Sequence, residues 1–270
     1  MKVQAFIAAW LRDMFEALLS WHPTMDWMIM KAAAPSPRLP TVASALVRAL
    51  APLALALPAM AQMPAPMICG ALSNGNNGPF DFRSERQLLA AGENNHFTSK
   101  VESLTGGHTA TVGADINFIL HMFPNHPRAL IAMMRWGEKL KTPKPYDTLY
   151  PVECYFERAL RFRPDDNVVR MIYALFLSKN ARHPEAIQQL DRVSAAAGEN
   201  AFTHYNAGLL YFDIKQYDKS AERARAAMAL GFSRPELIDK LKAVGKWVEP
   251  VAESATPAPA ASAASASAPS

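Results

Sequence analysis

The sequence predicts an all-α fold, a short solenoid of helical hairpins with a non-repeat segment before it and a capping helix after it. The first observation is a period, because Pro164, Gly198 and Phe232, which end predicted helices, follow one another at intervals of 34 positions. The second is that small and apolar residues recur at helical spacing on both sides of a polar turn within each period. Such a period is typical of repeat proteins, in which each hairpin buries its apolar face against the next.

The clearest repeat covers residues 201–232. Gly208 allows the two helices to approach closely, and Ala224 and Ala227 are small where the second helix receives larger side chains. The stretch resembles one tetratricopeptide repeat, whose signature positions are occupied by Tyr205, Asn206, Gly208, Tyr211, Tyr217, Ser220, Ala224 and Ala227. This resemblance implies right-handed stacking of the hairpins and a role in binding other proteins, because such repeats rarely carry out chemistry themselves.

A second copy precedes it at residues 167–200. Ala174 takes the position of Gly208, and Leu177 takes that of Tyr211. The second helix of this copy carries Ala186, Leu190 and Val193 on one face, after a polar turn marked by Pro184.

Upstream the period is interrupted. Residues 127–141 and 152–162 resemble the two helices of a further repeat, with a ten-residue loop inserted between them. Residues 115–123 resemble one more second helix, and this partial repeat completes the roughly three units that a stacked core requires. Residues 235–247 are predicted to form the capping helix, with Leu237, Leu241, Val244 and Trp247 facing inward. The repeats and the cap together span 111–250.

The two ends have other signatures. Residues 30–61 combine basic residues, a short apolar run and a small-x-small ending at Ala61, which is typical of an export peptide cleaved after that residue. Residues 1–29 are interpreted as an over-extended start or an unstructured leader, with an amphipathic helix as the alternative. Residues 251–270 are almost entirely Ala, Pro and Ser and are predicted to form a disordered tail.

The two cysteines, Cys69 and Cys154, are predicted to form a disulfide if the chain is exported to an oxidising compartment. Two small buried thiols are the alternative. The bond would hold the non-repeat segment 62–110 against the helix at 152–162. Within that segment, residues 69–98 have two interpretations: an N-terminal cap in which Phe80 and Phe82 cover the first helix pair, or a loop that contacts a ligand.

Enzyme chemistry and cofactor binding are not predicted. The chain contains no phosphate-binding glycine loop, no zinc-protease motif and no serine-hydrolase motif. His121 and His126 are five residues apart around Pro124, which is the wrong spacing for two metal ligands on one helical face, so capping or surface positions are expected.

Nucleic acid is not predicted as a partner either, although the chain has a net charge of +4. Its basic residues around the helix at 152–162 alternate with acidic ones, which is typical of a mixed, solvated surface. The residues concerned are Arg158, Arg161, Arg163 and Arg170, interleaved with Glu157, Asp165 and Asp166.

In the tetratricopeptide family the first helix of each repeat lines the concave face. The resemblance therefore implies a largely apolar groove formed by Phe202, Tyr205, Asn206, Leu209, Phe212, Met171 and Leu175. Such a groove either binds an apolar or aromatic peptide or is filled by the protein's own terminal segments. Together with residues 69–89, 125–130 and 153–159, the repeats resemble uncharacterised exported tetratricopeptide-repeat proteins of Gram-negative bacteria. The predicted function is a periplasmic scaffold or adaptor without a transmembrane span in the mature chain. The alternative is an envelope enzyme or ligand-binding protein with a pocket formed by residues 69–98.

Overall fold

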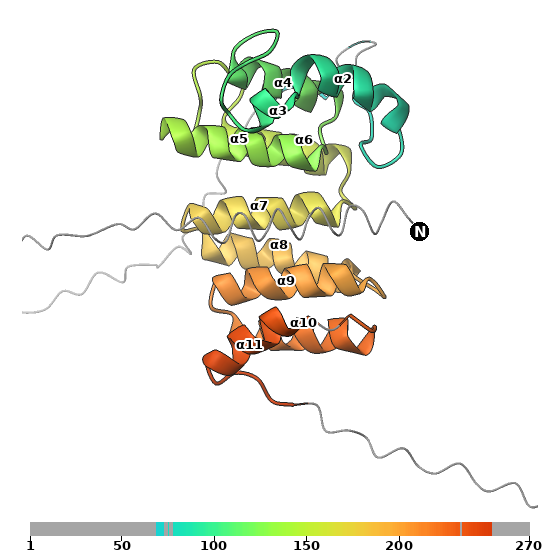
Figure 1. Ribbon diagram of the computed structural model, residues 1–270, viewed down its shortest axis with the longest axis vertical. Coiled ribbons are helices and arrows are strands. Elements are labelled where there is room, and N and C mark those ends of the chain that lie inside the picture. Colours follow the sequence, from blue (N-terminus) through green and yellow to red (C-terminus); the bar gives the residue numbers. More distant parts are fainter. Residues whose placement is uncertain (1–68, 73–74, 76–77, 233, 250–270) are drawn as a thin grey trace, which may run out of the picture. The chain divides into compact units, whose positions relative to one another are not determined.

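The computed structural model describes residues 69–72, 75, 78–232 and 234–249, which belong to one compact unit (Figure 1). This part of the chain is helical and contains no strand, which confirms the all-α class there. The helices of its N-terminal portion are η1 (Arg86–Leu88), α2 (Leu89–His96), α3 (Ser99–Glu102) and α4 (Val112–Met122). They are followed by α5 (Pro127–Leu140), α6 (Val152–Phe162), α7 (Asn167–Lys179), α8 (His183–Ala196), α9 (Ala201–Asp213), α10 (Tyr217–Ala229) and α11 (Pro235–Ala243).

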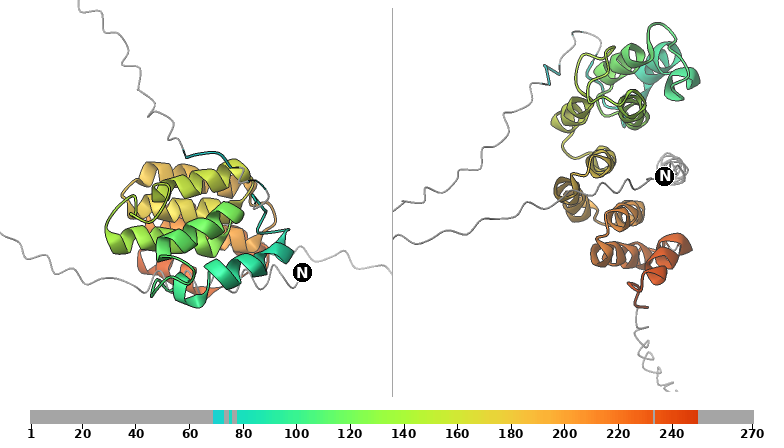
Figure 2. Two further views of the ribbon diagram at one scale, coloured as in Figure 1. Left: turned by 90° about the horizontal axis from the view of Figure 1, so that it is seen from above. Right: turned by 90° about the vertical axis from the view of Figure 1, so that its left-hand side faces the viewer.

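The longer helices form two layers. Helices α5, α7 and α9 lie side by side in one layer, and α6, α8 and α10 form the other, as the end-on view shows (Figure 2, right). Helices α3 and α4 pack against α5, while α11 packs against α9 and α10. The described chain is therefore a helical repeat-like fold in which neighbouring helices bury their apolar faces against one another.

The 34-residue period is also present in the structure. Helices α7 and α9 begin at Asn167 and Ala201, and α8 and α10 begin at His183 and Tyr217, so both pairs are 34 positions apart. The N-caps repeat as well: Asp166 accepts hydrogen bonds from two backbone amides of α7, and Asn200 accepts one from Thr203 N of α9. The repeat seen in the sequence is thus a repeat of helix starts and of their caps.

The turns inside the two hairpins are closed in the same way. Ala181 and Lys215, again 34 positions apart, have φ angles of 59° and 61°. The residue after each donates its backbone N–H to a carbonyl five positions earlier, Arg182 to Leu177 at 2.9 Å and Gln216 to Tyr211 at 2.8 Å. This is the bonding of a Schellman motif, in which the left-handed position usually carries glycine.

A glycine at this position is therefore expected to stabilise the protein. Lys215 is exposed, and its left-handed backbone costs a residue with a Cβ atom about 1 kcal/mol or more. We expect Lys215→Gly to raise the free energy of unfolding by about 1 kcal/mol in urea titrations. The matched control is Ala226→Gly inside α10, which should lower it by a similar amount. A stability loss in both variants would contradict the interpretation of the turn.

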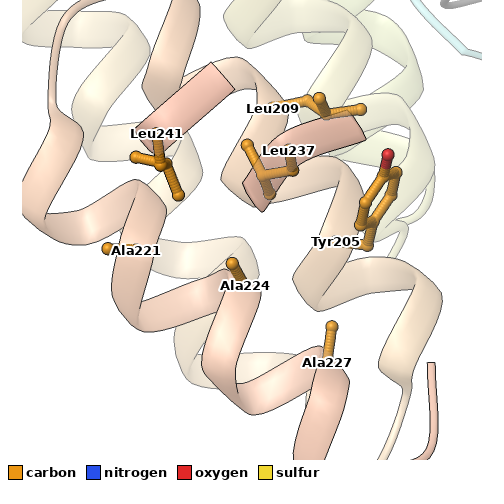
Figure 3. Packing of buried hydrophobic residues seen from close by; sticks show 7 residues of the cluster. All are labelled: Tyr205, Leu209, Ala221, Ala224, Ala227, Leu237 and Leu241. Carbon is orange, nitrogen blue, oxygen red and sulfur yellow. The ribbon is translucent and has the colours of Figure 1, made fainter. Parts of the chain in front are cut away.

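At the C-terminal end, a buried cluster joins three helices (Figure 3). Its members are Tyr205 and Leu209 of α9, Ala221, Ala224 and Ala227 of α10, and Leu237 and Leu241 of α11. Because the alanine side chains of α10 are small, the larger side chains of α9 and α11 can pack closely against this helix. Gly208 is needed here, because a Cβ atom there would lie 2.7 Å from Leu237 Cδ2.

The structure corrects one detail of this end. The capping helix ends at Ala243, and Val244 is 42 % exposed, so its predicted inward position is wrong. Leu237 and Leu241 are buried as predicted, and Trp247 packs, partly buried, against the cluster from beyond the helix. The N-cap of α10 is Gln216, which forms no side-chain capping bond. Asp218 lies in the first turn of this helix.

The predicted interruption is a ten-residue loop, 142–151, between α5 and α6. Upstream of it, α4 begins at Val112, three residues before the predicted start, because Thr111 caps the helix by accepting a bond from Ala114 N. The expectations for the export peptide, the leader and the C-terminal tail all lie outside the described residues.

Candidate functional site

Most of the predicted groove residues are internal. Tyr205 and Leu209 are buried under Leu237 and Leu241 of α11 (Figure 3). Asn206 of α9 and Met171 of α7 are buried too. At the C-terminal end of the described residues, the capping helix α11 therefore covers Tyr205 and Leu209, two predicted groove residues of α9.

The other three predicted residues keep accessible surface. Phe202 is 40 % exposed, and Leu175 and Phe212 are half-buried. The ring of Phe202 packs on that of Phe232 with centroids 4.5 Å apart, and Phe212 packs on Tyr217 at 5.2 Å. These contacts hold the two aromatic rings in place while leaving part of each ring uncovered.

Helix α7 provides the matching positions one repeat earlier. Val168 and Ser178 are half-buried, like Leu175, and lie 34 positions before Phe202 and Phe212. These two accessible positions therefore correspond in the two helices, whereas Leu175 is accessible and its counterpart Leu209 is buried. They form a narrow, mostly apolar stripe, defined here as Val168, Leu175, Phe202 and Phe212.

The N-terminal segment packs on the first helices. Phe82 is buried, with its ring centroid 4.5 Å from that of His126, and the half-buried Phe80 lies 5.6 Å from Phe123. The Phe80 amide also donates to Met122 O at 2.7 Å. These contacts favour the cap interpretation of residues 69–98. Asn74, Asn76 and Asn77, at the tip of the predicted ligand loop, lie outside the described residues.

The predicted disulfide is confirmed. The Sγ atoms of Cys69 and Cys154 are 2.11 Å apart and their Cα atoms 5.1 Å apart. Beside it, Arg158 of α6 donates from Nη1 to the carbonyls of Cys69 and Ala71, at 2.9 and 2.6 Å. The start of the described chain is thus held on α6 by one covalent bond and by arginine–carbonyl hydrogen bonds.

Arg158 departs from the predicted solvated surface. Its side chain is only 1 % exposed, because residues 69–71 lie over it and Tyr150 stacks 5.0 Å from the guanidinium carbon. Burial lowers the pKa of this guanidinium below its ordinary value. The interleaved charges of the sequence do not distinguish this buried arginine from its exposed neighbours, because its partners lie almost 90 positions away in the chain.

His126 is a buried capping residue. Its Nδ1 accepts from Ala129 N at 3.2 Å, and its Nε2 donates to the Glu93 carboxylate at 3.1 Å, so the imidazole is the neutral Nε2–H tautomer. Burial lowers the pKa of His126, although its hydrogen bond with Glu93 acts in the opposite direction. His121 is half-buried and bonds Asn117 O through Nδ1 at 2.7 Å. Both histidines therefore have structural partners, and the predicted capping position holds for His126.

A buried polar junction, which the sequence did not predict, joins the N-terminal segment to two turns. Asn125 donates through Nδ2 to Asp81 at 2.8 Å and to Asp166 at 3.0 Å, and its Oδ1 accepts from Phe82 N at 3.0 Å. Burial raises the pKa of Asp166. Burial also acts to raise the pKa of Asp81, but bonds from Arg83 and Asn125 outweigh it and keep that pKa well below its usual range. The junction is a structural contact, with both carboxylates occupied.

Among the described residues, no group of three or more His, Cys, Asp or Glu side chains is placed to hold a metal ion. No helix in this same part of the chain has the length and apolar character needed to cross a membrane. Comparison with known proteins finds no family model, no curated protein and no solved structure that matches the chain. The arguments about function therefore rest on the residues and their geometry.

Proposed function

We propose that the protein is a periplasmic scaffold or adaptor of the tetratricopeptide-repeat type, which binds a protein or peptide partner along the apolar stripe of α7 and α9. The observation that carries the proposal is the correspondence of accessible positions in two successive hairpins. Val168 and Phe202 share one repeat position, and Leu175 and Phe212 extend the stripe along each helix. A peptide laid across the stripe would contact both helices at once.

The geometry supports an apolar partner better than a partner that is bound through a carboxylate group. The stripe itself contains no charged side chain, and the one amide predicted for it, Asn206, is buried. An apolar or aromatic segment is therefore the partner that fits, because its burial requires no charge compensation.

Export is supported by the disulfide, since such bonds persist in oxidising compartments. The cap contacts of Phe80 and Phe82 argue against the alternative function, an enzyme or ligand-binding protein with a pocket under residues 69–98.

The test is site-specific photocross-linking in the cell envelope of the native host. A photoreactive phenylalanine analogue replaces Leu175 on the stripe or, as the matched control, the exposed Gln188 on α8 of the same hairpin. We expect one discrete adduct at position 175 and none at 188. The analogue at position 202 should give an adduct as well, and Leu175→Glu should abolish that adduct without loss of helical circular dichroism. Adducts of equal yield at both positions, or none at either, would refute the proposal.

A further inference from the structure

The loop at 142–151 is firmly held. Val152 N donates to Pro143 O at 2.8 Å and closes the base of the loop. The carboxylate of Asp147 accepts from Trp136 Nε1 at 2.9 Å and from Gly113 N at 2.8 Å, which ties the loop to α5 and α4. The buried Thr148 hydroxyl bonds Pro145 O at 2.9 Å. The loop therefore has one packed side and a fixed shape, as a compact Ω-type loop does.

Two large apolar side chains point away from that packed side. Tyr146 is 80 % exposed and Leu149 is 60 % exposed. Among the described residues, the only other large hydrophobic side chain that is more than half exposed is Val248. Large apolar side chains that a rigid loop leaves exposed to water, here three residues apart, are typical of a contact site.

The chain leading to the tip is basic. Within the part of the chain that the structure describes, Lys141, which directly precedes the loop, and Lys144, two positions before Tyr146, form no ion pair. The two carboxylates of this stretch are already engaged: Glu138 pairs with Lys179 at 3.1 Å, and Asp147 holds the loop. The exposed apolar tip is therefore accompanied by positive charge that is not neutralised.

We propose that this tip binds the surface of an anionic lipid bilayer. Tyr146 and Leu149 enter the headgroup region, and Lys141 and Lys144 lie against the lipid phosphates. A tyrosine suits that depth because its ring is apolar and its hydroxyl is polar. Basic residues beside an inserted apolar group add electrostatic attraction to anionic lipids.

Two other occupants fit the tip less well. A second copy of the chain would bring like charges together, because the same lysines would face each other across a two-fold contact. A groove on another protein would have to enclose a ten-residue loop, whose area is small beside the roughly 800 Å² per partner of a stable interface. A bilayer needs only one or two inserted side chains, and the pinned loop loses little conformational entropy on insertion.

The test uses the full chain with a fluorescent reporter at the tip. Since the structure contains no free cysteine, Leu149→Cys provides a unique thiol for a polarity-sensitive dye. Phosphatidylglycerol vesicles that carry a nitroxide lipid at headgroup depth should quench this dye. The matched control is Leu230→Cys, another exposed leucine, which follows α10 and not the α5–α6 loop. We expect quenching at 149 and not at 230.

Charge and apolar contact are then separated. Lys141→Glu combined with Lys144→Glu should lower the vesicle affinity about tenfold or more, and Tyr146→Ser should lower it severalfold. Neutral phosphatidylcholine vesicles that carry the same nitroxide lipid should quench the dye at position 149 only weakly. Absence of quenching, equal quenching at both labels, or quenching that is insensitive to the charge reversal would overturn the proposal. If envelope proteins change the fluorescence of the dye at position 149 and vesicles do not, the lipid proposal is overturned in favour of a protein partner.

Discussion

Replacing Cys69 and Cys154 by serine is expected to lower the free energy of unfolding by about 2–5 kcal/mol. The bond joins residues 85 positions apart, so it removes a large loop from the conformations open to the unfolded chain. In the chain-entropy account, a loop of this size corresponds to roughly 4–5 kcal/mol. Both cysteines are buried, so the serine hydroxyls would cost free energy wherever they lack a hydrogen-bond partner.

Hydrogen bonds hold the same segment but do not replace the disulfide. Arg158 bonds the carbonyls of Cys69 and Ala71, and Arg161 bonds that of Gly70 at 2.5 Å. Each such bond contributes about 1–3 kcal/mol only while the segment stays in place, and freeing the segment removes all of them together.

Urea titration of the wild type with and without reductant, alongside the double serine variant, measures the effect. The reduced wild type should match the variant, and the variant itself should not respond to reductant. A difference below about 0.5 kcal/mol between oxidised and reduced protein would show that the segment is held without the cross-link.

The helical part of the fold was predictable because its determinants are local and repeated. Small residues recur with the period, as Ala174 and Gly208 do, and so do capping residues such as Asp166 and Asn200. Each hairpin packs mainly on the next one along the chain, so a pattern of 34 residues contains most of what places α7 to α10. The disulfide was predictable for a different reason, because two cysteines allow only one pairing within the chain.

The surface that remains accessible was not predictable in the same way. Tyr205 and Phe202 both occupy groove positions of one repeat, yet α11 covers Tyr205 and leaves Phe202 partly open. The repeat pattern says which side of α9 faces the groove, but the path of the chain after Gly231 decides what fills it. Arg158 gives a second example, since its burial depends on residues 69–71, far away in the sequence.

The second large effect is expected at Asn125, whose amide lies between two carboxylates. Asn125→Leu keeps a similar volume but removes the donor shared by Asp81 and Asp166 and the acceptor for Phe82 N. All three groups stay buried, so each loses a bond that water cannot replace. We expect the free energy of unfolding at pH 7.5 to fall by about 3 kcal/mol, since three buried groups each lose a hydrogen bond.

The pH dependence of this loss distinguishes the junction from a general packing defect. Without the Asn125 donor, the folded-state pKa of both carboxylates should rise, because two negative charges then face each other. The folded variant will therefore take up protons more readily than the folded wild type as the pH falls, and protonation will stabilise it relative to the wild type. The loss measured in urea at pH 4.5 should be smaller than at pH 7.5. Asn180→Leu, at an exposed turn where the amide bonds Phe176 O, is the matched control and should change stability by less than about 1 kcal/mol at either pH. An Asn125→Leu loss that is independent of pH would mean that side-chain shape, and not the shared donor, is what the site requires.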